Sequence, residues 1–249
     1  MLNLISLGAG AQSTYLTLSA AKGVFGVIPD AAIFADTQAE PFWVYENLRF
    51  ITQNVPFPVY RVTAGNLATD TLNGVNSTGQ KFYSIPWRME NALGRRQCTR
   101  EYKLKPIYQK IRELGATAKN PARLWVGISM EEAHRAKPAR VKYVENVWPL
   151  LDHRIYRLDC LKWMADQGYP VPRKSACVFC PYHGNDEWRA VKEHDPDGWR
   201  LALKVDESIR VGGVKQYAHR DLVPLNHANL DKADQADLFG EECEGMCGV

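Results

Sequence analysis

The stretch Ser6-Leu7-Gly8-Ala9-Gly10-Ala11-Gln12-Ser13-Thr14 decides how this chain begins to fold. It follows the apolar run Leu2-Asn3-Leu4-Ile5 and precedes Tyr15-Leu16-Thr17-Leu18-Ser19-Ala20-Ala21, which is typical of a helix. A glycine-rich turn between a strand and a helix forms an anion site, because glycine lets the backbone approach the anion and the free N–H groups of the first helical turn point at it. The hydroxyls of Ser6, Ser13 and Thr14 add donors. The stretch therefore predicts a phosphate-binding loop; the alternative is a tight turn whose glycines serve steric needs alone.

Strand-like and helix-like segments alternate along the first part of the chain. The apolar runs predict strands over residues 2–7, 31–35, 58–62 and 124–128, and the helical patterns fall over residues 13–22, 41–53 and 105–114. This alternation predicts an α/β fold with a doubly wound, mostly parallel sheet that binds ligands at the carboxyl ends of its strands. Residues 64–96 are rich in Gly, Asn, Ser and Thr, and we expect them to form a long loop.

The amino-acid composition of the sequence changes after Pro149. With 249 residues, the chain suits one α/β domain, or a core domain with an appended lobe. We expect residues 1–150 to form the α/β core with the phosphate loop. Residues 151–249 would form a cysteine-rich region that packs on this core and ends in an acidic tail.

Charge and hydropathy limit the classes of partner. The chain has no run of about 18 apolar residues, so no membrane span is expected. It has no basic segment followed by a hydrophobic leader, which indicates a cytosolic, cytoplasmic protein. Residues 86–142 carry fourteen Lys and Arg against five Asp and Glu. Such an excess favours a polyanionic partner such as nucleic acid, and the alternative is a solvated charged surface.

The six cysteines are more often ligands or redox groups than disulfides in a reducing compartment. Cys177-Val178-Phe179-Cys180-Pro181 is a C-x-x-C motif within a proline-rich segment, which suggests a loop shaped around a cofactor. Four thiolates from Cys98, Cys160, Cys177 and Cys180 would satisfy either a zinc ion or a [4Fe–4S] cluster, and their spacing does not separate the two. Cys160 has a second interpretation, as part of the apolar face of a helix expected over residues 158–167.

Two further cysteines, Cys243 and Cys247, stand in the glycine-punctuated acidic tail. A tail thiol can attack a substrate or carry a sulfur atom. The alternative is a frayed terminus with idle cysteines.

Five segments, which follow one another along the chain in the family's order, resemble the adenine-nucleotide α-hydrolase superfamily, and within it the branch similar to phosphoadenosine-phosphosulfate (PAPS) reductase. Gly8-Ala9-Gly10-Ala11-Gln12-Ser13 resembles the S-G-G-x-D-S phosphate loop (PP-loop) of that superfamily, with Gln12 in place of the aspartate. Cys98-Thr99 stands where the cluster-bearing reductases have a Cys-Cys pair. The other matching segments are Phe34-Ala35-Asp36-Thr37-Gln38-Ala39-Glu40, Gly127-Ile128-Ser129-Met130-Glu131-Glu132 with the following Arg135, and the C-x-x-C motif.

The resemblance implies that the chain binds ATP, or the sulfonucleotides PAPS or adenosine phosphosulfate (APS), together with Mg²⁺. The nucleotide contacts it implies are Ser6, Gly8, Gly10, Gln12, Ser13, Thr14, Asp36, Thr37, Gly127 and Arg135. The catalytic residues it implies are Ser13, Asp36, Arg135, Cys243 and Cys247. In these roles the loop would hold pyrophosphate, Arg135 would neutralise developing charge, and Asp36 would position the ribose or Mg²⁺.

Three functions fit these features. The first is an ATP pyrophosphatase that activates a nucleic acid by adenylylation for sulfur insertion, similar to the enzymes of DNA phosphorothioation or tRNA thiolation. It would use a [4Fe–4S] cluster and a sulfur donor such as a cysteine desulfurase. The second is a thioredoxin-dependent PAPS or APS reductase, although Glu242-Cys243-Glu244-Gly245 only partly resembles the tail of those enzymes. The third is a zinc-stabilised nucleotide-binding partner subunit, which Gln12 in place of aspartate favours.

Overall fold

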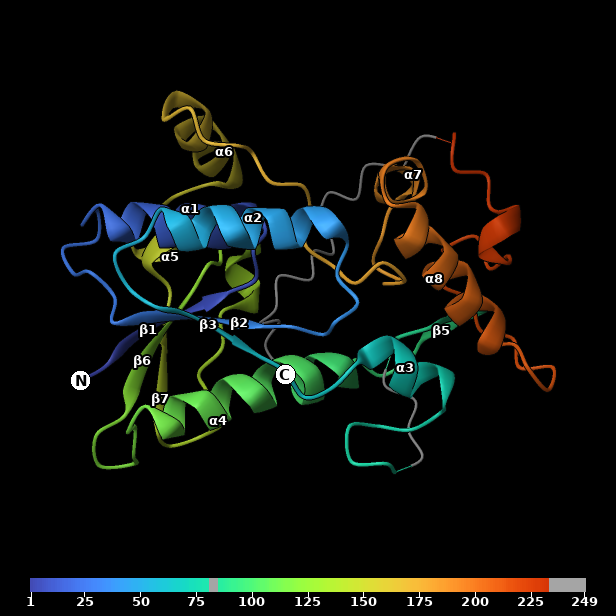
Figure 1. The fold of residues 1–249 in the computed structure, drawn as a ribbon, viewed down its shortest axis with the longest axis horizontal. Coiled ribbons are helices and arrows are strands. Elements are labelled where there is room, and N and C mark those ends of the chain that lie inside the picture. The colour runs from blue at the N-terminus through green and yellow to red at the C-terminus, as the bar shows by residue number, and fades with distance from the viewer. Residues whose placement is uncertain (81–84, 233–249) are drawn as a thin grey trace.

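A computed structural model of the chain describes residues 1–80 and 85–232. Its centre is a five-stranded sheet in which every pairing is parallel (Figure 1). In spatial order, the strands are β3 (Val59–Val62), β2 (Ala31–Ala35), β1 (Asn3–Leu7), β6 (Ala122–Val126) and β7 (Val144–Val147). The chain builds outward from β1 to β3 and then adds β6 and β7 on the other side of β1. This confirms the predicted α/β fold with a doubly wound parallel sheet, and it places the reversal of strand order between β1 and β6.

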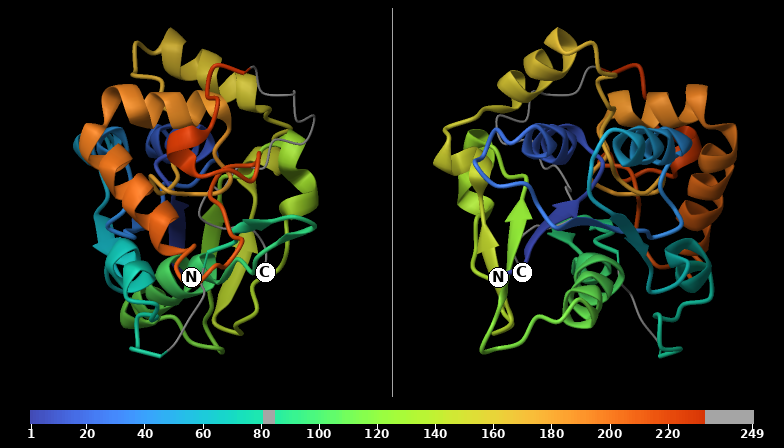
Figure 2. Two further views of the ribbon diagram at one scale, coloured as in Figure 1. Left: turned by 90° about the vertical axis from the view of Figure 1, so that its right-hand side faces the viewer. Right: turned by 60° about the vertical axis from the view of Figure 1, so that its left-hand side comes forward.

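Helices cover both faces of the sheet (Figures 1 and 2). On one face lie α1 (Ala11–Ala21) and α2 (Phe42–Gln53), and on the other lies α4 (Lys105–Glu113). Side chains of a strand alternate between the faces, so Ile5 packs in the cluster under α1 and α2 while Leu4 packs in the cluster under α4. The central strands β1 and β2 are mainly apolar on both sides because both of their faces are buried.

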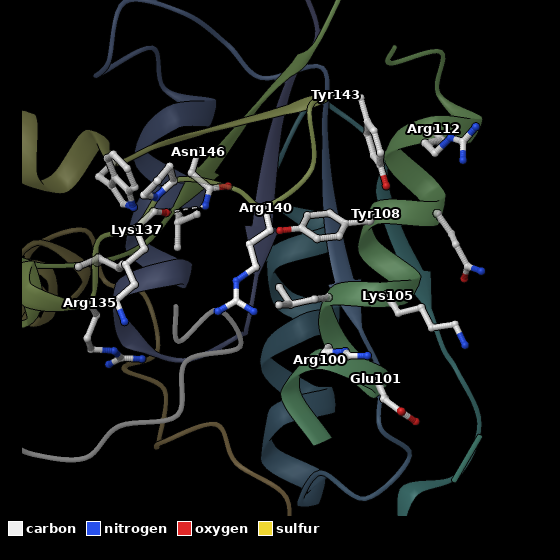
Figure 3. Close-up of a pocket in the computed structure, with 16 residues that line it drawn as sticks. Arg100, Glu101, Lys105, Tyr108, Arg112, Arg135, Lys137, Arg140, Tyr143 and Asn146 are labelled. Carbon is white, nitrogen blue, oxygen red and sulfur yellow. Dashed lines mark hydrogen bonds between the residues drawn. The ribbon is translucent and has the colours of Figure 1, made fainter. Parts of the chain in front are cut away.

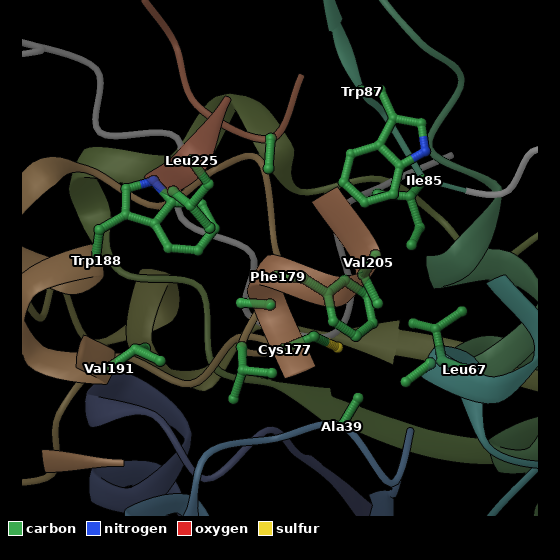
Figure 4. Packing of buried hydrophobic residues seen from close by; sticks show 14 of the residues in the cluster. Ala39, Leu67, Ile85, Trp87, Cys177, Phe179, Trp188, Val191, Val205 and Leu225 are labelled. Carbon is green, nitrogen blue, oxygen red and sulfur yellow. The ribbon is translucent and has the colours of Figure 1, made fainter. Parts of the chain in front are cut away.

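The second half of the chain adds helices at two places. After the short helix α5 (Pro149–Asp152), helix α6 (Arg157–Asp166) packs against α1. Helices α7 (Asn185–His194) and α8 (Pro196–Ser208) enclose a separate apolar cluster with α3 (Leu67–Leu72), and Trp188 is fully buried in it (Figure 4). The C-x-x-C motif lies in a loop, as predicted, and its Cys177 belongs to this cluster.

The prediction of a loop over residues 64–96 is wrong. This region contains α3 and a two-stranded antiparallel hairpin of β4 (Arg88–Met89) and β5 (Ala92–Leu93). Helix α3 begins after Asn66, whose side chain accepts a hydrogen bond from Thr69 N at 2.9 Å and so caps the helix. The hairpin is held by a bridge between Arg88 and Tyr217.

Other boundaries differ by a few residues. Strand β6 ends at Val126 rather than residue 128, because Ile128 N donates to Val126 O at 2.9 Å and the backbone leaves the sheet at Gly127. Helix α1 begins at Ala11, two residues earlier than expected. The described residues also form three short helical segments: the π-helix η1 (Thr99–Leu104), which continues into α4, and the 3₁₀ helices η2 (Met130–Arg135) and η3 (Leu225–His227). No helix in the described part of the chain is long and apolar enough to cross a membrane.

Candidate functional site

The turn between β1 and α1 presents backbone N–H groups at the reversal of strand order. Gly10 precedes the helix in an extended conformation and has no side chain with which to cap it. The first bond of the helix runs from Thr14 N to Gly10 O at 2.9 Å, so the N–H groups of Ala11, Gln12 and Ser13 have no partner within α1. The first turn contains no acidic residue. Free N–H groups and the positive end of the helix dipole together make this turn suited to an anion.

The loop is held in a strained conformation by distant segments. Ala9 has a φ of 59°, which costs a residue with a Cβ atom roughly 1–2 kcal/mol. Asn47 Nδ2 on α2 donates to Ala9 O and to Thr14 Oγ1, both at 2.9 Å. Ser175 Oγ donates to Gly8 O from the segment before the C-x-x-C motif. Strain that the surroundings maintain in this way is typical of a functional site.

Sequence reasoning missed both Asn47 and Ser175. The sequence does indicate that Asn47 is buried, because Asn47 lies on the face of α2 that also carries the buried Val44, Leu48 and Ile51. A polar residue within an apolar helical stripe usually has a specific partner.

Gly127 brings the end of β6 against the first turn of α1. A Cβ atom at Gly127 would lie 3.0 Å from Ser13 N and 3.1 Å from Ser13 Cα, so even a methyl group there would press the backbone of α1 away. The structure therefore brings together the predicted residues Gly10, Gln12, Ser13 and Gly127.

Gln12 is buried and joins the loop to two other elements. Its Nε2 donates to Glu132 Oε2 at 3.3 Å, and its Oε1 accepts from Arg157 Nη1 at 3.0 Å. Glu132 also forms an ion pair with Arg135. Arg135 is thus connected to the loop through Glu132, and the neutral amide of Gln12 suits a position between an acceptor and a donor.

Asp36 stands at the carboxyl end of β2, and both of its carboxylate oxygens have partners. Tyr45 OH and Gln38 N donate to Oδ1 at 2.9 and 2.8 Å, and Arg61 Nε donates to Oδ2 at 2.8 Å. Burial and the neighbouring Asp36 raise the pKa of Tyr45, so its hydroxyl stays a donor at neutral pH. A contact between Asp36 and Mg²⁺ stays a prediction, and it would require the carboxylate to exchange one of these partners.

Thr37 faces the cysteine motif. Its Oγ1 lies 3.2 Å from Cys177 Sγ and 3.3 Å from Glu40 Oε1, and Lys103 Nζ lies 3.4 Å from the same Glu40 oxygen. All four side chains are buried. Burial, with the nearby Glu40 carboxylate, raises the pKa of the Cys177 thiol well above its usual range, so the thiol is protonated at neutral pH in this environment.

Three of the four predicted metal ligands lie around one cavity. Cys98, Cys177 and Cys180 line a cavity of about 20 Å³, whereas Cys160 is buried in the cluster between α6 and α1. Among the described residues, no three Cys, His, Asp or Glu side chains lie close enough together to hold a metal ion. Cys243 and Cys247 fall outside the described residues.

A cavity of about 570 Å³ opens on the α4 face of the sheet, beside the carboxyl end of β6 (Figure 3). Val126 and Ile128 line it, while Gly127 between them faces α1. Arg135 also lines it, so the cavity and the loop adjoin the same strand end from opposite faces.

No protein-family model and no curated protein sequence matches the chain. Among solved structures, it is similar to the phosphoadenylyl-sulfate (PAPS) reductase from Candida auris, solved as a phosphate complex. The TM-score is 0.44 at 13% sequence identity, and the match covers 68% of this chain and 75% of that chain. At this similarity the match assigns no residue and no activity, and the α/β fold is established by the parallel sheet itself.

Proposed function

We propose that the chain is an ATP-pyrophosphatase-type enzyme of sulfur metabolism. It would bind ATP, or a sulfonucleotide, with the phosphates at the β1–α1 loop, and would activate a nucleic acid by adenylylation for sulfur insertion. DNA, as in phosphorothioation, and tRNA are the two acceptors to test, with a cysteine desulfurase or another protein as sulfur donor. The observation that carries the proposal is the set of free N–H groups of α1 at the strand reversal, with Gly127 packed against them.

The residues around the loop suit the departure of pyrophosphate. The backbone N–H groups would stabilise the charge on the leaving group, and Ser13 Oγ, which now donates to Gly10 O at 3.3 Å, would turn toward it. Arg135 would add a positive charge beside the same strand end. Mg²⁺ at Asp36 would complete the neutralisation of the phosphates.

The first experiment measures the conversion of ATP to AMP and pyrophosphate, with Mg²⁺ and with either DNA or tRNA. Arg135→Ala is expected to lower the rate about 10²-fold, because one donor to developing charge is worth that much. Arg200→Ala, which removes an exposed arginine of α8, is the matched control and should leave the rate unchanged. Thioredoxin-dependent release of sulfite from PAPS, without ATP turnover, would instead favour a reductase.

We also propose that Cys98, Cys177 and Cys180 hold a metal group, either a [4Fe–4S] cluster or zinc. Their place around one cavity supports this, and thiolates suit both groups. As they lie in the structure, these three thiols are not close enough together to share a metal ion, so they would have to move to bind it, and we assign no reaction step to this group.

Metal analysis after anaerobic purification tests this proposal. Cys177→Ser and Cys180→Ser are expected to lose most of the bound iron and acid-labile sulfide, or most of the zinc. Cys160→Ala is the matched control and should keep its metal, because Cys160 lies in a different apolar cluster. Equal metal content in all three variants would show that this cavity is not the metal site.

A further inference from the structure

The cavity on the α4 face is lined by charged and aromatic side chains that, apart from Arg135, have no part in the proposed ATP chemistry. Of the charged side chains that line it, six are cationic and one, Glu101, is acidic. The cations are Arg100, Lys105, Arg112, Arg135, Lys137 and Arg140. Within residues 1–80 and 85–232, no carboxylate forms an ion pair with Lys137 or Arg140. Their charges are therefore available to an anionic ligand.

Aromatic side chains line the same space. Tyr108 and Tyr143 pack edge to face with their ring centroids 6.3 Å apart, and Trp148 lies nearby on the lining. Tyr108 extends from α4 toward Arg140 on the opposite wall (Figure 3). Burial raises the pKa of Tyr108, so its hydroxyl stays neutral at physiological pH. Half-buried rings beside cations form a surface on which a planar base can stack.

A directional polar group completes the lining. Asn146 Nδ2 donates to Lys137 O at 3.0 Å, which fixes the orientation of the amide. Asn146 Oδ1 is buried and has no hydrogen-bond partner among the described residues. Because solvent does not reach this oxygen, the side chain would have to shift toward the cavity before the oxygen could accept from the amino group of a base.

The volume and shape of the cavity limit the size of the ligand that it can hold. About 570 Å³ lies within the range of pockets for small molecules and has room for one nucleotide unit. A base inside a duplex cannot enter such a cavity, whereas a base of a single strand can.

We propose that this cavity binds one nucleotide unit of a single-stranded nucleic acid, with its base among Tyr108, Tyr143 and Trp148 and its phosphates on the cations of the rim. The proposal builds on the proposed function, because it gives the acceptor a place beside the activated phosphate. Gly127 faces the loop while Val126 and Ile128 line the cavity, so the two ligands would meet across one strand end.

The test measures fluorescence anisotropy of a labelled 20-nucleotide single strand, as DNA and as RNA, at several salt concentrations. The double variant Lys137→Ala/Arg140→Ala is expected to weaken binding at least tenfold and to reduce the dependence of binding on salt. Tyr143→Leu is expected to weaken binding about tenfold with an unchanged salt dependence, because stacking involves no counterion release. Lys119→Ala/Lys204→Ala removes two exposed lysines outside the cavity and should behave as wild type.

Three outcomes would overturn the proposal. Equal weakening by the control pair would indicate a diffuse charged surface. Equal affinity for a duplex would exclude a cavity that receives an unstacked base. Displacement of the strand by equimolar AMP would show that the cavity takes a free nucleotide rather than a strand.

ATP binding, measured on the same variants by equilibrium dialysis, separates this proposal from the proposed function. Unchanged ATP affinity with weakened strand binding supports a separate acceptor site. Loss of both in Lys137→Ala/Arg140→Ala would overturn it, because the cavity would then belong to the ATP site. If the wild type binds the strand through this cavity but binds no ATP, the cavity proposal stands and the ATP-pyrophosphatase proposal fails.

Discussion

Replacing Asp206 with alanine is expected to destabilise the protein by about 3–5 kcal/mol. Its carboxylate is 1% exposed and accepts from Ala218 N at 3.1 Å and from Leu225 N at 2.9 Å, while Arg210 Nη1 lies 2.8 Å away. Alanine would leave two buried N–H groups without their acceptor and a largely buried guanidinium without its counter-charge. Asp206 therefore attaches the segment after α8 to that helix, and the loss of stability on its replacement should be large.

Asp197→Ala is the matched control, because Asp197 lies on the same helix and also pairs with an arginine, Arg200. Both of these side chains are exposed, at 85% and 75%, so the change should cost less than about 1 kcal/mol. Urea denaturation followed by circular dichroism measures both values. A cost for Asp206→Ala as small as that of the control would contradict the structural role of the buried carboxylate.

Replacing Gly127 with valine is expected to weaken ATP binding at least tenfold and to destabilise the fold by about 1–3 kcal/mol. Even a single Cβ atom would lie 3.0 Å from Ser13 N, and the atoms it meets are backbone, which cannot rotate away. The first turn of α1 would have to move, and the N–H groups that face the anion would move with it. Gly127→Ala should also weaken ATP binding and destabilise the fold, but by less than Gly127→Val.

The control for Gly127→Val is Ala92→Val, which adds a larger side chain at an exposed position of the β5 strand. Thermal unfolding and equilibrium dialysis with ATP measure the two effects. Unchanged ATP affinity in Gly127→Val would show that the start of α1 does not bind the phosphates.

The sheet was predictable because its central strands are mostly apolar on both faces, which leaves short, mainly apolar runs in the sequence. Strand β7 was missed because it lies at the edge of the sheet and carries Glu145 and Asn146, so it lacks such a run. Helix α3 was missed for another reason. It is six residues long and contains two threonines, and it is stabilised by packing Leu67 in the cluster with α8, far away in sequence.

The candidate site, like the sheet and the helices, could be predicted from the sequence only in part. The turn between β1 and α1 was predictable because it is one contiguous stretch, and phosphate binding by this turn stays a prediction. That Cys160 lies apart from the other cysteines depends on which side of α6 packs against α1, and spacing along the chain does not contain that information. The charge excess of residues 86–142 was visible, but its concentration around one cavity follows from the fold, in which α4 packs on β2 and β3 and its side chains face residues of β6, β7 and the segment after β6 across the cavity.

The pairing of β1 with β6 has a consequence for synthesis of the chain. Leu4 pairs with Leu124, so β1 has an open edge until the ribosome has added roughly 120 further residues, which takes about 6–24 s at typical elongation rates. During that interval an apolar strand offers unpaired N–H and C=O groups to other nascent chains. The central strand of the finished sheet is thus the one most exposed to misassembly while the protein is being made, and chaperone demand should peak before β6 emerges.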